Sequence, residues 1–294
     1  MTFWPPHVAE RIVADQWVLF LGSGVSSSCR NAAGASPPGW VALLEMLCAK
    51  IRDDASRVDG EELIASRQLL AAADHIRFQM AEETNVNEYL RTIRVAVEGP
   101  VADRYSPSFL YELLLSLEPH IVFTTNYDKI FEVASKNGYS THGFESLTLC
   151  DDLRRGDPVF VKLHGSIDSM SDIVLTRTDY ARLARDGKHV FDALNALSLT
   201  TTILFIGYSL DDPDIQLVLQ AVGRSRLNPE AHFMLAPEPT AASRAPLFKE
   251  AFGVSILSYP AEDHSKAVEA LSELSDKVLS IRAERGSGGF YARL

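Results

Sequence analysis

The chain has 294 residues, 46% of them hydrophobic and 23% charged, which suffices for one large α/β domain with a packed core. Its 39 acidic and 28 basic residues give a net charge of −11, and this acidity disfavours direct nucleic-acid binding because phosphate backbones are repelled. No apolar run approaches the roughly 18 residues of a membrane helix, and the first residues lack a basic, apolar secretion signal, so we expect a cytoplasmic protein without membrane contact.

The first predicted element is a buried strand over Trp17–Leu21, a short apolar run followed by turn residues. Directly after it comes the motif Gly22-Ser23-Gly24-Val25-Ser26. Glycines at this point let the backbone turn sharply and bring its N–H groups against a phosphate. The dinucleotide fingerprint G-x-G-x-x-G is incomplete because Ser27 occupies the third glycine position, so a plain tight turn remains an alternative.

A long helical insertion is predicted between the first two strands. The stretch from Leu21 to Ile121 is too long for a single crossover connection, and its interior is rich in Ala, Leu and Gln. We place the insertion at about residues 40–117, with Pro37-Pro38-Gly39 as the hinge that leads into it.

The second predicted strand, Ile121–Phe123, runs into Thr124-Thr125-Asn126-Tyr127-Asp128. Ligands of parallel α/β sheets bind outside the carboxyl ends of the strands, so these polar side chains are candidates for a binding crevice. The alternative is that Asn126 caps a helix beginning near Asp128.

Two further strands end in motifs of the same kind. Val159–Val161 leads into Lys162-Leu163-His164-Gly165-Ser166, where a neutral histidine could accept a proton or simply be a structural group. Ile203–Ile206 leads into Gly207-Tyr208-Ser209-Leu210, a turn that opens a helix.

Short apolar runs at Phe233–Leu235 and Val254–Leu257 complete the pattern of strands alternating with amphipathic helices. This alternation predicts an α/β fold with a Rossmann-like, doubly wound, mostly parallel sheet. We expect one domain over residues 1–294, ending in a flexible tail at about 285–294.

The order of the motifs that follow these strands is more specific than any one of them. A Gly-Ser-Gly turn, Thr-Asn-Tyr-Asp, Leu-His-Gly-Ser and Gly-Tyr-Ser-Leu, each after a predicted strand, resembles the sirtuin superfamily from about Val18 to Asp214. The pattern is most similar to the SIR2-like NAD hydrolases of prokaryotic antiphage defence systems.

This resemblance implies roles for particular residues. Asn126 would hold the nicotinamide ribose and the attacking water, and His164 would act as the general base. By the same resemblance, the residues that contact NAD would be Gly22, Ser23, Gly24, Ser26, Thr125, Asp128, Gly207, Tyr208 and Ser209.

The sequence departs from the sirtuin deacetylases in its cysteines. Those enzymes resemble one another in a zinc module with two cysteine pairs, whereas Cys29, Cys48 and Cys150 are isolated, so we expect no metal. This favours hydrolysis of NAD to nicotinamide and ADP-ribose, as abortive antiphage defence, over deacylation. The alternatives are an NAD-dependent deacylase or ADP-ribosyltransferase, and a non-catalytic sensor of NAD or ADP-ribose.

Such an activity is toxic unless it is restrained. We therefore expect a homo-oligomer or control by a separate partner, and the resemblance suggests a HerA-type ATPase or an Argonaute-type protein.

Overall fold

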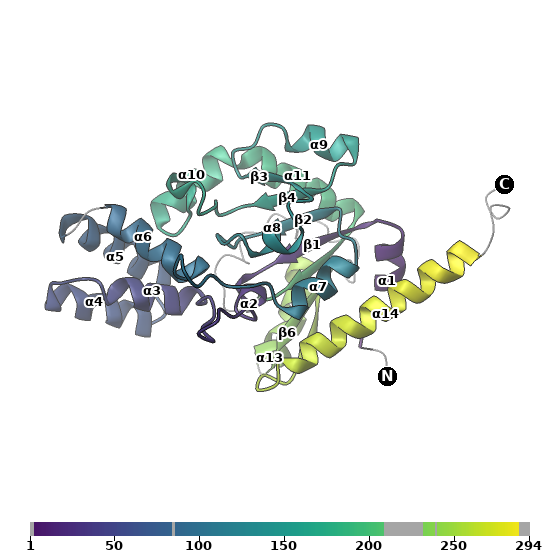
Figure 1. Cartoon of the computed structure of the whole chain (residues 1–294), viewed down its shortest axis with the longest axis horizontal. Helices are drawn as coiled ribbons and strands as arrows, with labels where there is room; N and C mark the ends of the chain where they lie inside the picture. Colours follow the sequence, from purple (N-terminus) through teal and green to yellow (C-terminus); the bar gives the residue numbers. More distant parts are fainter. Residues whose placement is uncertain (1–2, 84–85, 209–231, 239, 288–294) are drawn as a thin grey trace.

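A computed structural model describes the chain apart from residues 1–2, 84–85, 209–231, 239 and 288–294. Its centre is a seven-stranded sheet in the order β3-β4-β2-β1-β5-β6-β7, and every neighbouring pair is parallel (Figure 1). The strands are β1 (Trp17–Leu21), β2 (Ile121–Thr124), β3 (Ser140–Gly143), β4 (Val159–Lys162), β5 (Thr202–Ile206), β6 (His232–Pro237) and β7 (Val254–Tyr259). The prediction of a doubly wound parallel sheet is confirmed.

The strand order locates the crevice of the sheet. When β3 is left aside, the remaining strands lie in the order third, second, first, fourth, fifth and sixth, as in a Rossmann fold. The direction of winding reverses between β1 and β5, and ligands of such sheets bind at the carboxyl ends of the strands on either side of that reversal. Gly22 after β1 and Gly207 after β5 therefore stand at the expected position of a ligand.

All five residues of β1 are buried because helices cover both faces of the sheet. Leu19 and Leu21 pack in a core with α1 (Pro6–Val13), α7 (Phe109–Ser116) and α14 (Ser265–Ser287). Val18 and Phe20 point into the opposite core, which includes α11 (Lys188–Thr200) and part of α13 (Thr240–Phe252). The alternation of side chains along a strand thus supplies both layers of the domain.

The other helices in the described part of the α/β domain are short connections. They are α2 (Ser23–Ser26), α8 (Ile130–Ala134), α9 (Leu149–Arg155), α10 (Arg177–Asp186) and the 3-10 helix Met170–Asp172. Within the described part of the chain, no helix combines the length and apolarity needed to cross a membrane.

Four helices between β1 and β2, which we call the helical unit, share a hydrophobic cluster. They are α3 (Trp40–Cys48), α4 (Asp54–Ala65), α5 (Leu69–Glu83) and α6 (Val86–Glu98), and they group together beside the sheet (Figure 1). This cluster also includes Tyr127, Ile167, Ile173 and Leu175 from the segments after β2 and β4. The range of 40–117 proposed from the sequence also takes in α7. That helix packs on the sheet through Leu110, Tyr111 and Leu114 instead.

Ion pairs fasten the helical unit to α10. Arg77 of α5 donates to both carboxylate oxygens of Asp179, at 2.8 and 3.0 Å, and Asp74 accepts from the backbone N–H of Arg177 at 2.9 Å. Asp179 also completes a capping box with Thr176 at the start of α10. Burial raises the pKa of Asp179, but the hydrogen bonds from Thr176 and the nearby Arg77 outweigh it and leave that pKa lowered.

Two features differ from the pattern read in the sequence. Strand β3 was not predicted, because Ser140–Gly143 is polar and His142 is its one buried residue. At the other end of the chain, α14 continues to Ser287, past the start of the expected tail at about residue 285. The last residues, 288–294, lie outside the described part.

Candidate active site

The crevice begins where the turn after β1 meets the turn after β5. The N–H of Gly22 donates to the carbonyl of Ile206 at 2.9 Å, and the N–H of Gly24 donates to the carbonyl of Gly207 at 2.8 Å. These two N–H groups were expected to face a phosphate. In the structure they hold two backbone turns together, so neither glycine offers its N–H to a ligand.

Close backbone packing explains why glycine occupies these positions. A Cβ on Gly22 would lie 2.6 Å from the Gly207 carbonyl oxygen, and one on Gly24 would lie 2.8 Å from the same atom. Gly207 has a φ of +78°, and a Cβ there would lie 2.5 Å from the Val25 nitrogen. Any side chain would push the two turns apart.

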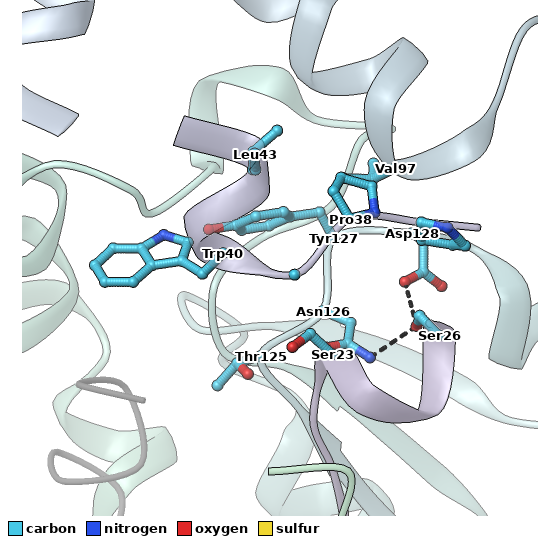
Figure 2. Close-up of a pocket in the computed structure, with 12 residues that line it drawn as sticks. Ser23, Ser26, Pro38, Trp40, Leu43, Val97, Thr125, Asn126, Tyr127 and Asp128 are labelled. Atoms are coloured by element: carbon cyan, nitrogen blue, oxygen red, sulfur yellow. Dashed lines mark hydrogen bonds between the residues drawn. The ribbon is translucent and has the colours of Figure 1, made fainter. Parts of the chain in front are cut away.

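Asn126 is held at the crevice by a network of hydrogen bonds (Figure 2). Its Nδ2 donates to the carbonyl of Gly22 at 3.0 Å and to Ser26 Oγ at 3.0 Å. Ser26 Oγ in turn donates to Asp128 Oδ2 at 2.7 Å. A turn after β2 is thereby linked to the turn after β1.

Tyr111 completes the network from α7. Its hydroxyl lies 3.2 Å from Ser26 Oγ, and because burial, followed by the nearby Asp128, raises the pKa of Tyr111 well above 10, this hydroxyl stays protonated. Ser26 donates its proton to Asp128, so Tyr111 is the donor in this contact. The Ser26 hydroxyl then accepts two hydrogen bonds and donates one, which uses its full capacity.

The network fixes which end of the Asn126 amide is free. Both donors of Nδ2 have acceptors, whereas Oδ1 accepts no hydrogen bond from any residue that the structure describes. The backbone N–H of Asn126 is held by Thr124 Oγ1 at 3.0 Å. Asn126 does not cap the next helix, since the N–H of Ile130 is bound by Asp128 Oδ1 at 2.9 Å. The amide oxygen is thus available to a ribose hydroxyl or a water molecule.

Asn126 lines a cavity of about 50 Å³, which we call the inner cavity. The helical unit and the segment leading into it supply an apolar wall that includes Pro37, Pro38, Trp40, Leu43 and Val97 (Figure 2). The other lining residues are Ser23, Ser26, Gly39, Thr125, Asn126, Tyr127 and Asp128. A flat, apolar group could pack on this wall with its polar edge toward the Asn126 network.

A larger cavity of about 650 Å³, which we call the outer cavity, lies over the carboxyl ends of β5, β6 and β7. Its lining includes the hydroxyls of Ser27 and Ser28, the cation Arg30 and His264, and none of the described lining residues is an Asp or a Glu. In a chain with a net charge of −11, such a lining favours an anion. Ser23 lines both cavities, so they adjoin at the turn after β1.

Two of the residues predicted to contact NAD link the ends of neighbouring strands through hydrogen bonds. Tyr208, 2% exposed, donates its hydroxyl to the carbonyl of Leu21 at 3.0 Å and lies 3.0 Å from Thr125 Oγ1. Tyr208 also lines the outer cavity, and Thr125 lines the inner cavity. Ser209, the third predicted residue of that motif, lies outside the described residues.

His164 lies after β4 and is 1% exposed. Its ring packs edge-on against Tyr180 of α10, with 5.5 Å between ring centroids, and it is not among the residues that line the inner or the outer cavity. The structure therefore brings together Asn126, Ser26, Asp128 and the glycine turns, and it places His164 in a separate buried environment.

Two residues of the site were missed in the sequence. Tyr111 lies in a predicted helical stretch where an aromatic residue is ordinary, and Lys162 was read as part of a strand ending. A lysine within a fully buried strand is the one signal that could have been noticed, because a buried ammonium needs acceptors.

Part of this chain matches a known protein family. The sequence model of the SIR2-like domain family matches residues 120–257, which run from the start of β2 into β7 and include Asn126 and His164. The chain contains a SIR2-like domain.

Curated relatives of this SIR2-like chain are named NAD(+) hydrolase ThsA. The one from Enterococcus faecium is 31% identical over 217 residues, which cover 73% of this chain and 41% of the relative. The one from Bacillus cereus (strain MSX-D12) is 22% identical over 215 residues, covering 72% of this chain and 41% of the relative. The chain thus spans about two fifths of the length of these relatives.

A solved Sir2 enzyme structure also aligns with the SIR2-like chain. The TM-score is 0.46 at 15% sequence identity, with 95% of this chain and 98% of the other chain covered.

Proposed function

We propose that this chain binds NAD⁺ across the crevice between β1 and β5 and hydrolyses its nicotinamide–ribose bond, releasing nicotinamide and ADP-ribose. The observation that carries the proposal is the Asn126 amide, whose nitrogen is fixed by Ser26 and Gly22 while its oxygen stays available beside the inner cavity. The names of the curated relatives support the same activity.

The two cavities suit the two halves of the dinucleotide. The apolar wall of the inner cavity suits the flat nicotinamide ring, with the polar edge of that ring toward Asn126. The outer cavity, lined by Arg30 and four serines, suits the adenosine and the two phosphates. Ser23, shared by both linings, would lie beside the bonds that join the halves.

Cleavage of the nicotinamide–ribose bond needs few catalytic groups from the protein. Nicotinamide leaves NAD⁺ as a neutral ring, so its departure needs no strong acid, and positive charge develops on the ribose instead. A fixed amide oxygen stabilises that charge and orients the attacking water, because it is already in place when the charge forms. Asn126 Oδ1 would have this role. The resemblance assigns the proton of the water to His164, but that side chain lies outside both cavity linings, so we propose that the proton passes to solvent.

An NAD⁺ hydrolase depletes a metabolite that every cell needs. We therefore propose that the chain acts in antiphage defence and is restrained until it assembles with copies of itself or with a partner protein. The restraint is argued from the toxicity of the activity, and the activity from the names of the ThsA relatives.

Product analysis tests the proposed function against its rivals. The purified chain is incubated with NAD⁺ over a range of protein concentrations, with and without an acyl-lysine peptide, and the products are separated by chromatography. Equal amounts of nicotinamide and ADP-ribose, independent of the peptide, are expected. Release that requires the peptide would identify a deacylase or transferase, and tight NAD⁺ binding without release at any concentration would identify a sensor.

A further inference from the structure

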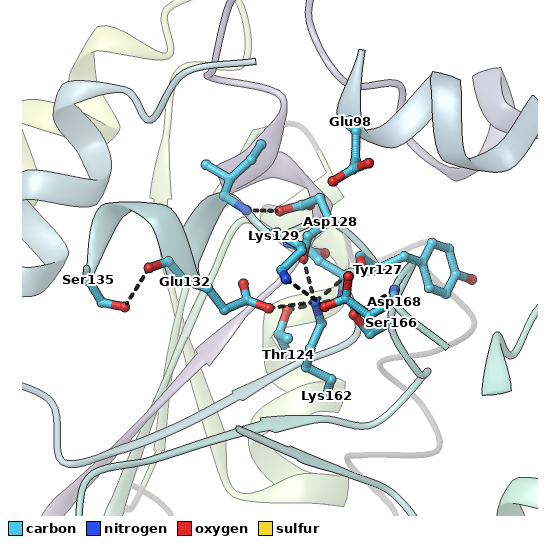
Figure 3. A network of polar contacts seen from close by, with 12 residues as sticks. Glu98, Thr124, Tyr127, Asp128, Lys129, Glu132, Ser135, Lys162, Ser166 and Asp168 are labelled. Atoms are coloured by element: carbon cyan, nitrogen blue, oxygen red, sulfur yellow. Dashed lines mark hydrogen bonds and ion pairs between the residues drawn. The ribbon is translucent and has the colours of Figure 1, made fainter. Parts of the chain in front are cut away.

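We propose that Lys162 is the positioning residue for Asn126, because it holds in place the backbone turn that carries the amide. The inference rests on the proposed function for its effect on catalysis. The Lys162 side chain is 1% exposed and comes from the carboxyl end of β4, where it pairs in register with Thr124 of β2. Its ammonium group therefore reaches beneath the turn that follows Thr124 (Figure 3).

All three N–H donors of the ammonium have acceptors around this turn. Nζ donates to the carbonyl of Tyr127 at 3.2 Å, to the carbonyl of Asp128, and to Glu132 Oε1 of α8 at 3.0 Å (Figure 3). Two of these acceptors are the carbonyls of the two residues that follow Asn126. The lysine thus fixes the path of the main chain at the site as well as pairing with a carboxylate.

The same turn is tied to the segment that follows His164. The Tyr127 carbonyl accepts a second hydrogen bond from the N–H of Ile167 at 3.1 Å, and the Tyr127 hydroxyl donates to the carbonyl of Val174 at 2.7 Å. Lys162 itself stands two residues before His164 in the chain. One side chain therefore joins the turn that bears Asn126 to the segment that leads into His164.

The competing explanation is a buried ion pair that stabilises the fold and does nothing else. In that case the partner that matters is Glu132, which is 7% exposed and has its second carboxylate oxygen unbonded among the described residues. Replacing a buried ion pair by apolar residues of similar volume is often neutral for stability. The two explanations therefore separate when the ion pair and the carbonyl bonds are removed independently.

Two variants make this separation. Glu132→Gln removes the ion pair and leaves Lys162 to hold the carbonyls of Tyr127 and Asp128. The double variant Lys162→Met/Glu132→Met removes the carbonyl bonds without leaving a buried unpaired charge. Thermal unfolding and circular dichroism of both variants establish that they are folded before any comparison is made.

The double variant is expected to lose about 10- to 100-fold in kcat for nicotinamide release with little change in NAD⁺ affinity, since a small displacement of a positioned group costs rate rather than binding. Glu132→Gln is expected to keep most of its kcat. Hydrogen exchange of the amides in residues 124–130 is expected to be faster in the double variant and unchanged in Glu132→Gln.

Similar kcat values in the two folded variants would overturn the proposal, whether both are kept or both are lost. Unchanged exchange at residues 124–130 in the double variant would also overturn it. The exchange measurement does not depend on turnover, so it tests the role of Lys162 in the turn by itself. Absence of nicotinamide release by the wild-type chain would refute the proposed function, and the exchange result would still decide the role of Lys162.

Discussion

At the scale of single residues, the orientation of the Asn126 amide depends on the serine beside it. Ser26, 3% exposed, bonds to Asn126, Asp128 and Tyr111 at once, so its hydroxyl determines how the amide is oriented. The resemblance seen in the sequence implied that Ser26 contacts NAD, with the phosphates as its nearest part. The structure gives its hydroxyl three protein partners, which leaves no capacity for a phosphate.

Ser26→Ala should therefore impair turnover more than the same substitution does at a serine away from Asn126. The change removes the hydrogen-bond partner of Asp128 Oδ2 and of the buried Tyr111 hydroxyl, and we expect a loss of about 1–3 kcal/mol in the free energy of unfolding together with a strong fall in kcat. Ser116→Ala is the control, because Ser116 Oγ bonds to the carbonyl of Leu113 and to Ser275 and lines neither the inner nor the outer cavity. Urea unfolding and nicotinamide release are measured for both, and equal activity in the two variants would contradict this role.

A second residue-scale prediction concerns pH. Burial lowers the pKa of His232 from its ordinary 6.5 to about 4, and its Nδ1 accepts from the N–H of Ile203 at 3.1 Å. Below pH 6.5 the unfolded chain takes up a proton that the folded chain does not, so stability falls as the pH drops toward 4.

The expected loss from His232 is about 2 kcal/mol in the free energy of unfolding between pH 7 and pH 5. His232→Asn keeps an acceptor for Ile203 but does not titrate, so this part of the pH dependence should disappear. Urea unfolding at the two pH values measures it. A variant with the same pH dependence as the wild type would show that His232 is not the group responsible.

At the scale of elements, the turns after β1 and β5 pack against each other through their backbones. Gly207→Ala puts a side chain at a φ of +78° and 2.5 Å from the Val25 nitrogen, so we expect a loss on the order of 3 kcal/mol in the free energy of unfolding. Gly143→Ala is the control, because a Cβ there meets nothing within 4 Å. Chemical denaturation compares them, and a Gly207→Ala variant as stable as Gly143→Ala would refute the close packing.

Most of the sheet could be predicted from the sequence because its strands are short apolar runs with turn residues after them. The run Trp17–Leu21 coincides with β1, and the other predicted runs each lie within an observed strand. Strand β3 could not be predicted, since an edge strand buries little and Ser140–Gly143 has no apolar alternation. The order of the strands follows from long-range pairing, which no local pattern encodes.

The sequence motifs were enough to predict which strand ends form the candidate site. The motif endings correctly grouped Asn126 with the Gly22–Gly24 turn, because carboxyl ends of parallel strands share one edge of the sheet. The partners of each hydrogen bond were not predictable, since Tyr111 and Lys162 reach the site from elements far away in the chain. The same limit explains why Gly24 was read as a phosphate contact when its N–H bonds to Gly207.

At the scale of the whole molecule, the helical unit packs beside the sheet and supplies part of one wall of the inner cavity. Arg77→Met removes its two hydrogen bonds to Asp179, so we expect faster hydrogen exchange in α5 and α6 and little change in β1 and β5. Arg57→Met is the control, because Arg57 pairs with Asp54 within α4. Exchange read by mass spectrometry tests this, and equal protection in the two variants would show that the Arg77 link does not hold the unit.

The central claim is that Asn126 at the crevice between β1 and β5 directs the cleavage of NAD⁺. Its most direct test is the initial rate of nicotinamide release at saturating NAD⁺ by the wild-type chain and by Asn126→Ala, with NAD⁺ binding measured for both. We predict release by the wild type and a fall of about 100-fold or more in the variant, with binding largely kept. Equal rates in the two proteins would contradict the claim.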